Sequence, residues 1–400
     1  MNDSETVVQE PAAADPQNAA QPPTRLTRPL RIFVLTAPFV LFLGILAGIE
    51  GIVRATLPHV STLDLFVRSA LQRQGFTDTE NVTIFEGDPL LFWKIRPSLD
   101  RVIWDFTMVS TNEQGLRHAG PIGTKREGSR RIVTLGDSVT FGYRIPVVFP
   151  GQPEDYDPEA LPYPLAMERD LRAANPDRDI EVVNLAVPGY TSHQGLAWLR
   201  RDIGKLEPDL VIACFGWNDV NLRAATDREM MQMDGYHAAL RHAGSASQII
   251  SHLVSWRRKG QPASVAPFAG PTLRVPIEDY VENFLEIAKL ATAHDATVAV
   301  IGPVYRGSPT PSKEAERMTQ QRNALRTAMQ EAGIAYLEIP ELTEHNHPEN
   351  IMLFGELVHP NVQGHRLMEV RLLELLARRE MLWDLSVPEL NVGYSRRRIR

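Results

Sequence analysis

Serine, histidine and carboxylate side chains occur in this sequence at positions that suit nucleophilic catalysis. Ser138 stands in "RIVTLGDS", directly after a β-branched apolar run, and Glu356 and His359 lie three residues apart in "GELVHPN". A serine hydroxyl becomes an effective nucleophile when a base takes its proton, and a neutral histidine suits that task near neutral pH. We therefore predict that Ser138 is a nucleophile, that His359 is its base, and that Glu356 orients His359.

Amide groups after two other apolar segments supply the second requirement of acyl transfer, which is the stabilisation of an oxyanion. Gly189 occurs in "NLAVPGYT" and Asn218 in "FGWNDV". We predict an oxyanion hole that consists of the backbone N–H groups of Ser138 and Gly189 and the side-chain amide of Asn218. One such donor typically contributes about 2.7–4 kcal/mol to transition-state stabilisation.

Three further residues are predicted to support these loops rather than to react. They are Asp137, a hydrogen-bonding residue beside the nucleophile, and Gly216 and Asp219, which flank the asparagine. Each motif alone also fits a purely structural role, because Ser138 could simply cap a helix and Asn218 could simply shape a turn. The catalytic interpretation depends on all of them meeting in space.

Alternating elements from residue 130 onward give a reason for them to meet. Apolar, strand-like runs are predicted at 131–136, 180–187, 209–216, 297–303 and 334–339, and helices at 162–174, 192–206, 278–294, 312–333 and 361–379. Continuous apolar strands that alternate with helices predict a parallel sheet covered on both faces. Residues that follow such strands converge at one edge of the sheet, where ligands bind.

Taken in order, these motifs resemble those of the SGNH (GDSL) hydrolase family. The first family block is matched by the "GDS" that ends in Ser138, the second by Gly189, and the third, G-x-N-D, by the "GWND" that contains Asn218. The last block, normally Asp-x-x-His, is matched by Glu356 to His359, followed by the family-like Pro-Asn. Four ordered blocks are much more specific than any one of them.

The resemblance covers roughly residues 130–380 and implies both a fold and an activity. The implied fold is a flavodoxin-like, three-layer α/β/α sandwich with a mostly parallel sheet, and the implied reaction is ester hydrolysis without a metal or cofactor. Glu356 departs from the family's aspartate, but glutamate is the third member of other serine-hydrolase triads. The G-x-S-x-G signature of the other common serine-esterase fold is absent from the sequence.

The N-terminal part predicts a membrane anchor. Residues 1–31 form a predicted disordered cytoplasmic tail, and the uncharged run "IFVLTAPFVLFLGILAGI" begins a transmembrane signal anchor over 32–53. Arginines precede this run, so the positive-inside rule places the N-terminus in the cytoplasm and the catalytic domain in the periplasm or outside the cell. A cleaved signal peptide is disfavoured by the long segment before the run. Gly44 and Gly48 form a GxxxG that suits a weak homodimer.

Three other regions complete the predicted organisation. Residues 54–129 are expected to form a juxtamembrane helix at 61–76 and a small β-rich collar that packs on the next domain. The hydrolase domain over 130–380 contains an insertion at 222–276, with two short amphipathic helices, that is a candidate lid. Its alternative is a surface excursion that touches no substrate. Residues 381–400 are predicted to be a C-terminal tail.

Composition limits the other classes of function. The formal net charge is −7, so nothing global favours nucleic-acid binding, and the single cysteine, Cys214, excludes an internal disulfide and predicts a core residue. His345 and His347 stand near acidic residues, but we expect a polar loop there and no metal site. His193 and His365 are predicted to lie on helix surfaces or at satisfied edges.

The sequence therefore predicts a single-pass serine esterase or O-acyl hydrolase of the inner or plasma membrane. An anchored, external catalytic domain favours esters of envelope polymers or lipids, especially O-acetyl groups on polysaccharide, as substrates. Two alternatives stay open, an O-acyltransferase that uses the same site and a catalytically inactive, SGNH-fold binding protein of the envelope.

Overall fold

The computed structural model describes ten stretches of the chain, and the predicted helix at 61–76 lies outside them. These stretches are residues 27–57, 84–88, 90–105, 107–146, 160–223, 225–231, 247–258, 271–306, 312–344 and 347–388. The chain divides into two compact units, residues 1–58 and residues 59–400. Each unit is described by itself.

The first unit contains one long helix, α1 (Arg28–Thr56). Its part over Ile32–Thr56 has a mean hydropathy of 2.6 and is long and apolar enough to cross a membrane. Apolar side chains such as that of Leu35, which is 78% exposed, face outward rather than into a core. The helix contains the predicted anchor at 32–53. Dimerisation through Gly44 and Gly48 stays a prediction.

A parallel sheet of five strands forms the centre of the second unit. Its strands are β5 (Arg130–Gly136), β6 (Ile180–Asn184), β7 (Leu210–Cys214), β10 (Thr297–Ile301) and β11 (Ala335–Leu337). The order across the sheet is β11-β10-β7-β5-β6, and every neighbouring pair is parallel. This is the flavodoxin-like order, in which the chain changes direction across the sheet between its first and third strands, and ligands bind at that switch point. In this protein the switch point lies between β5 and β7.

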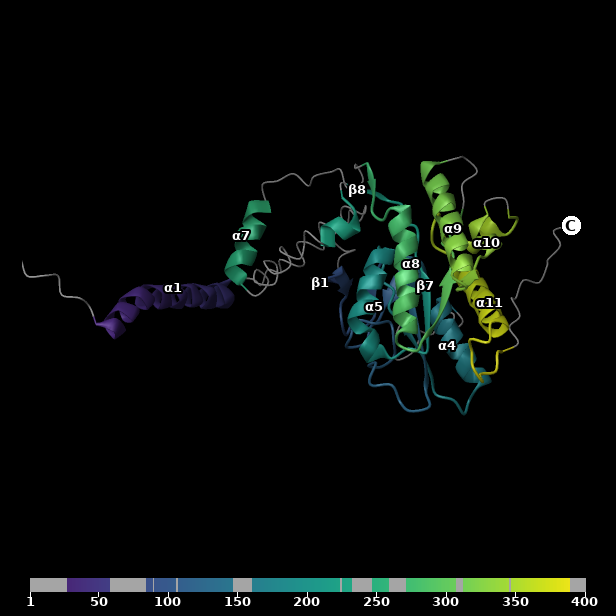
Figure 1. The fold of residues 1–400 in the computed structure, drawn as a ribbon, viewed down its shortest axis with the longest axis horizontal. Coiled ribbons are helices and arrows are strands. Elements are labelled where there is room, and N and C mark those ends of the chain that lie inside the picture. The colour runs from purple at the N-terminus through teal and green to yellow at the C-terminus, as the bar shows by residue number, and fades with distance from the viewer. Residues whose placement is uncertain are drawn as a thin grey trace, which may run out of the picture. The chain divides into compact units, whose positions relative to one another are not determined.

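Helices cover both faces of this sheet and make the predicted three layers (Figure 1). The helices are α4 (Tyr163–Ala174), α5 (Ser192–Leu206), α8 (Ile277–Thr292), α9 (Lys313–Glu331) and α11 (Val362–Arg378). Along β5, Val133 and Leu135 join the apolar cluster under α5, α8 and α9. Ile132 joins the opposite cluster, which α4 and α11 cover and which also buries Cys214. The period of two along a strand thus divides the core into two layers.

The collar consists of two antiparallel hairpins that pack on the sheet domain. The first pairs β1 (Phe85–Asp88) with β2 (Phe92–Ile95), and the second pairs β3 (Val102–Trp104) with β4 (Thr107–Val109). Trp93 donates a hydrogen bond from Nε1 to the carbonyl of Pro188 at 3.1 Å. Trp104 makes edge contacts with the rings of Phe141 and Tyr143. The collar therefore contacts the loops that follow β5 and β6.

The insertion at 222–276 leaves and re-enters the domain through one short ribbon. The ribbon pairs β8 (Leu222–Arg223) with β9 (Thr272–Leu273) in antiparallel fashion. One of the two predicted amphipathic helices corresponds to α7 (Gln248–Arg258), on which Leu253 and Trp256 are exposed. Much of the other lies outside the described residues, and the function of a lid stays a prediction.

The predicted boundary at residue 380 is wrong, because the chain continues to pack beyond it. Met381, Leu382 and Leu385 are buried in the cluster under α4 and α11. Ser386 donates its backbone N–H to the Asn175 side chain at 2.7 Å and accepts from it at 2.9 Å. The short segment after α11 has no helical periodicity, so the sequence pattern did not show that it covers the core.

Candidate active site

A sharp turn after β5 places Ser138 at the carboxyl edge of the sheet. The strand ends at Gly136, and Asp137 caps the short helix α3 (Ser138–Phe141) by accepting the Val139 N–H at 2.9 Å. A Cβ atom at Gly136 would lie 2.1 Å from Thr140 Oγ1, so a larger side chain does not fit. The serine is thereby the first residue of a helix, where its own N–H has no partner within that helix.

A second loop brings His359 to the serine. The loop lies between the 3-10 helix η3 (Asn350–Leu353) and α11, and Gly355 donates its N–H to the carbonyl of His359 at 3.0 Å. His359 Nε2 lies 2.7 Å from Ser138 Oγ. Its other ring nitrogen, Nδ1, contacts Glu356 Oε1, which also accepts the backbone N–H of His359 at 3.1 Å. The three predicted catalytic residues therefore lie in one hydrogen-bonded line.

The electrostatics of this line favour a charged Glu356. Partial burial acts to raise the pKa of Glu356, but the hydrogen bonds and charge of His359 outweigh it and lower that pKa to about 2. An ionised carboxylate can only accept hydrogen bonds, so His359 must carry its proton on Nδ1. Nε2 is then an acceptor, and it faces the hydroxyl of Ser138.

Gly189 occupies the turn between β6 and α5. Its φ of 85° is in the left-handed region, which glycine adopts without strain. The next residues form a capping box at the start of α5, because Thr191 and Gln194 exchange side-chain and backbone hydrogen bonds. Within the described part of the chain, no acceptor contacts the backbone N–H of Ser138 or of Gly189. Both groups can therefore donate to an oxyanion.

Asn218 links the loops after β5, β6 and β7. Its Nδ2 donates to the carbonyl of Tyr190 at 3.0 Å and lies 3.4 Å from Asp137 Oδ2. The predicted oxyanion residues are thus on adjoining loops. In this state the amide bonds to protein acceptors, so donation to a substrate would compete with one of these contacts.

The predicted supporting residues are buried at the same edge of the sheet. Asp219 accepts the backbone N–H and the hydroxyl of Ser192 at 2.9 and 2.6 Å, and burial raises its pKa to about 7. Burial also raises the pKa of Asp137 to about 6, although the Val139 N–H opposes this change. A Cβ atom at Gly216 would lie 2.3 Å from Pro303, which explains the glycine.

Sequence reasoning missed several residues that hold the site. The ring of Tyr143 lies 4.2 Å from that of His359 at an angle of 32°. Arg117, which follows the collar in the chain, donates to the carbonyls of Phe141 and Gly142 at the end of the nucleophile helix α3. Tyr143 is five residues from Ser138 and could have been suspected from that spacing, whereas nothing in the sequence connects Arg117 with this helix.

A buried arginine from the insertion was also missed. Arg274 is 3% exposed and pairs with Asp227, and one of its guanidinium nitrogens donates to the carbonyl of Gly189 at 2.9 Å. Neither residue belongs to a recognisable motif. The contact joins the insertion to the glycine turn of the site.

Two other described histidines, His193 and His365, are not part of this line. His193 is partly exposed at the start of α5, as predicted. The prediction for His365 is wrong, because this side chain is fully buried, accepts the Tyr163 N–H at 3.3 Å and has a pKa that burial lowers to about 3. Among the described residues, which include His347 but not His345, no group of three or more His, Cys, Asp or Glu side chains could hold a metal.

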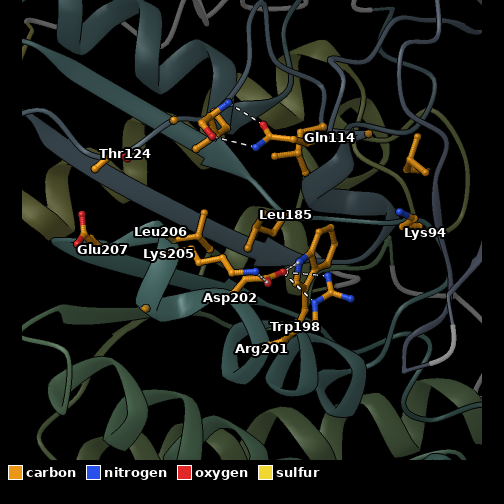
Figure 2. Close-up of a pocket in the computed structure, with 16 residues that line it drawn as sticks. Lys94, Gln114, Thr124, Leu185, Trp198, Arg201, Asp202, Lys205, Leu206 and Glu207 are labelled. Atoms are coloured by element: carbon orange, nitrogen blue, oxygen red, sulfur yellow. Dashed lines mark hydrogen bonds and ion pairs between the residues drawn. The ribbon is translucent and has the colours of Figure 1, made fainter.

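A cavity of about 570 Å³ lies between the collar and α5, and no predicted site residue lines it. Figure 2 shows Trp198, Arg201 and Asp202 gathered on one side of it, joined by hydrogen bonds and an ion pair. Arg201 also pairs with Asp88 at 3.0 Å. These polar groups are therefore occupied by one another. The lining residues are Lys94, Ile95, Gln114, Gly115, Leu116, Ile122, Gly123, Thr124, Leu185, Trp198, Arg201, Asp202, Gly204, Lys205, Leu206 and Glu207.

Comparison with known proteins gives one family match over most of the sheet domain. The model of the GDSL-like lipase/acylhydrolase family matches residues 134–367, a range that contains every predicted catalytic and oxyanion residue. An arylesterase of Vibrio mimicus is 31% identical over 93 residues, which are 23% of this chain and 40% of that protein. The chain thus spans less than half the length of this curated relative.

Three of the solved structures that resemble this chain are 16–19% identical to it. An acetylxylan esterase from Geobacillus stearothermophilus is 18% identical and covers 64% of this chain and 95% of its own, with a TM-score of 0.40. An α/β hydrolase enzyme from the metagenome of Lake Arreo is 19% identical, with coverages of 64% and 98% and a TM-score of 0.42. A GDSL-like lipase from Bacteroides thetaiotaomicron is 16% identical, with coverages of 64% and 92% and a TM-score of 0.39.

Proposed function

The chain belongs to the GDSL-like lipase/acylhydrolase family, and we propose that it is a hydrolase that cleaves carboxylic esters through an acyl-enzyme on Ser138. The observation that carries the proposal is the distance of 2.7 Å between Ser138 Oγ and His359 Nε2, continued on the other side of the ring by Glu356. This is the arrangement that a serine needs for activation.

The reaction has two steps, and in each of them His359 first accepts a proton and then donates it. In the first, His359 takes the proton of Ser138 Oγ while that oxygen forms a bond to the ester carbonyl carbon. The tetrahedral intermediate then collapses, the bond to the alcohol oxygen breaks, and His359 gives its proton to the leaving alcohol. In the second step, a water molecule loses a proton to His359 and attacks the acyl carbon. The bond from that carbon to Ser138 Oγ then breaks, His359 returns the proton to Oγ, and the carboxylic acid leaves.

Charge develops at two places during these steps, and separate groups stabilise each. Glu356, which stays ionised at neutral pH, stabilises the imidazolium that forms on His359. The oxyanion accepts hydrogen bonds from the backbone N–H groups of Ser138 and Gly189 and from the Asn218 amide. The two backbone donors are fixed before the reaction and need no reorganisation when charge develops. The Asn218 amide must first exchange one of its contacts with protein acceptors for the oxyanion.

The proposed substrates are esters of the cell envelope, namely O-acetyl groups on polysaccharide or lipid esters. The support is the helix α1, whose part from Ile32 onward is long and apolar enough to anchor the chain in a membrane. The arginines that precede this apolar part favour a cytoplasmic N-terminus and an external catalytic domain. Protease treatment of spheroplasts, in which the outer face of the inner or plasma membrane is accessible, followed by detection of an N-terminal epitope, tests this orientation. Protection of the whole chain from the protease would contradict it.

A fluorophosphonate probe and an ester panel test the proposed chemistry on the full chain in detergent. We expect covalent labelling of the wild type, none of Ser138→Ala, and hydrolysis of nitrophenyl esters and acetylated sugars. Transfer of the acyl group to an added sugar, with little release to water, would favour the O-acyltransferase. A folded wild-type protein that neither reacts with the probe nor cleaves esters would overturn the proposal and favour an envelope binding protein.

A further inference from the structure

The insertion at 222–276 begins and ends against the loops of the site. Arg274 donates its backbone N–H to the carbonyl of Asn221 at 2.8 Å, and Val275 donates to the carbonyl of Asp219 at 3.1 Å. Asp227 in turn donates its N–H to the carbonyl of Arg274 at 2.8 Å. The base of the insertion is therefore a hydrogen-bonded continuation of the turn that carries Asn218.

The side chain of Arg274 reaches from this base to the glycine turn. Its guanidinium forms two bonds with the Asp227 carboxylate, from Nε to Oδ1 at 3.1 Å and from Nη2 to Oδ2 at 2.9 Å. Nη2 also donates to Gln194 Oε1 at 3.0 Å, and Nη1 donates to the carbonyl of Gly189 at 2.9 Å. Asp227 completes the network by accepting the hydroxyl of Thr191 at 2.8 Å.

These bonds hold the turn from within the protein interior. Arg274 and Asp227 are 3% and 4% exposed, so neither can contact a ligand. A buried ion pair contributes little net stability compared with apolar side chains of the same size. A planar guanidinium does, however, fix the directions of several acceptors at once, which a lysine ammonium cannot do.

The two peptide groups on either side of Gly189 are held by different segments, one by the collar and the other by the insertion. The N–H of Gly189 shares a planar trans peptide with the carbonyl of Pro188, so the two point in opposite directions. Trp93 of the collar binds that carbonyl at 3.1 Å, and Arg274 of the insertion binds the carbonyl of Gly189. With both carbonyls fixed, the glycine is held at its φ of 85°, and the direction of its N–H is set.

We infer that Arg274, held by Asp227, is a positioning residue that aims the Gly189 N–H at the oxyanion. The inference rests on the proposed function, because it assigns that N–H to the oxyanion hole. It makes the insertion part of the catalytic apparatus: a displacement of the ribbon at its base would move an oxyanion donor. The insertion then affects the chemical step and not only the access of substrate.

The test compares Arg274→Met with Arg131→Met in the full chain in detergent. Arg131 is a matched control, because it is also 3% exposed and pairs with a carboxylate, that of Glu181, at 2.6 Å at the beginning of β5, the opposite end of the strand from Ser138. Loss of one oxyanion donor costs about 10²–10³-fold in kcat. Since Arg274 only aims its donor, we expect about a 10- to 100-fold fall in kcat for Arg274→Met, with KM changed less than about twofold.

A second readout separates a misdirected donor from a general loss of structure. We would compare an oxygen ester with its thionoester, in which the carbonyl oxygen is replaced by sulfur, a weaker hydrogen-bond acceptor. The preference of the wild type for the oxygen ester should fall at least about tenfold in Arg274→Met, in proportion to the lost oxyanion bond, and should be unchanged in Arg131→Met. If Arg274→Met does not fold, Arg274→Lys keeps the charge and is measured in the same way.

The outcomes distinguish the inference from the proposed function. A wild type that is labelled at Ser138, together with a folded Arg274 variant that keeps both the wild-type kcat and the wild-type preference for the oxygen ester, would overturn the inference and leave the proposed function intact. An equal loss of preference in Arg131→Met would also overturn it. A wild type without any reactive serine would instead remove the proposed function.

Discussion

Replacing Glu356 with glutamine tests the electrostatic part of the mechanism. Burial acts to raise the pKa of Glu356, but the hydrogen bonds and charge of His359 lower it from 4.5 to about 2, a net shift that corresponds to about 3 kcal/mol in favour of the ionised carboxylate beside His359. The Glu356 side chain is 35% exposed, so solvent screening reduces the usable part to about 2 kcal/mol. At about 1.4 kcal/mol for each factor of ten, we expect kcat/KM of Glu356→Gln to fall by about 30-fold. Any misorientation of His359 would add to this loss.

The assay is the hydrolysis of a nitrophenyl ester by the full chain in detergent between pH 5 and 9. Glu341→Gln is a matched control, because it removes a carboxylate that pairs with Arg371 at 2.8 Å, outside the catalytic line. A folded Glu356→Gln that keeps more than half of the wild-type kcat/KM, while Glu341→Gln behaves identically, would refute the electrostatic argument.

Three further predictions concern the neighbours of the catalytic line. Asn218→Ala should lower kcat by about 10²–10³-fold through loss of an oxyanion donor, measured with the same ester. Tyr143→Phe should keep most of the activity and Tyr143→Ala should lower it, because only the ring packs on His359; equal losses in both would contradict this. Asp219 has a raised pKa of about 7 against 3.8 when unfolded. Its contribution to stability is therefore full below about 3.8 and is lost as the pH rises through about 7. Asp219→Asn should show a smaller fall in unfolding free energy between pH 5 and 8 in urea titrations than the wild type.

The elements of the sheet domain could be predicted because their signals are local. The predicted helix at 192–206 has the bounds of α5, whose start is marked in the sequence by the Thr191 and Gln194 capping box. Strand positions followed from apolar runs, and the flavodoxin-like, mostly parallel class of the sheet followed from the family resemblance. The proposed catalytic residues could also be identified from the sequence, since Ser138, Glu356 and His359 each stand in a short motif next to a predicted element.

The prediction for His365 was wrong because this side chain lies on the buried face of its helix and not on the exposed one. The helix itself was predicted, but His365 lies on the stripe that continues with Met368, Leu372 and Leu376, and all four side chains are fully buried. The spacing of three and four residues places them on one face. The sequence therefore contained the signal that this histidine belongs to the core, and the polar residue type concealed it.

Residues that hold the site could not be predicted, because their partners are distant in the chain and their types are common. Arg274 binds the carbonyl of Gly189, and Arg117 binds carbonyls at the end of α3. An arginine that donates to a backbone carbonyl imposes no requirement on the side chain of its partner. Such contacts leave no pattern in a single sequence, and only the fold reveals them.

The collar and the insertion both hold the backbone of the catalytic core at Gly189. The core supplies the proposed nucleophile and base, but Trp93 from the collar holds the peptide that carries the Gly189 N–H, and Arg274 from the insertion holds the next peptide through the Gly189 carbonyl. A donor that is misdirected by even a small rotation loses most of its hydrogen bond, because these bonds weaken steeply with angle. The rate of the chemical step should therefore depend on segments that contribute no reacting atom. The collar and the insertion are accordingly parts of the active site in energetic terms, although the motifs of the family contain neither.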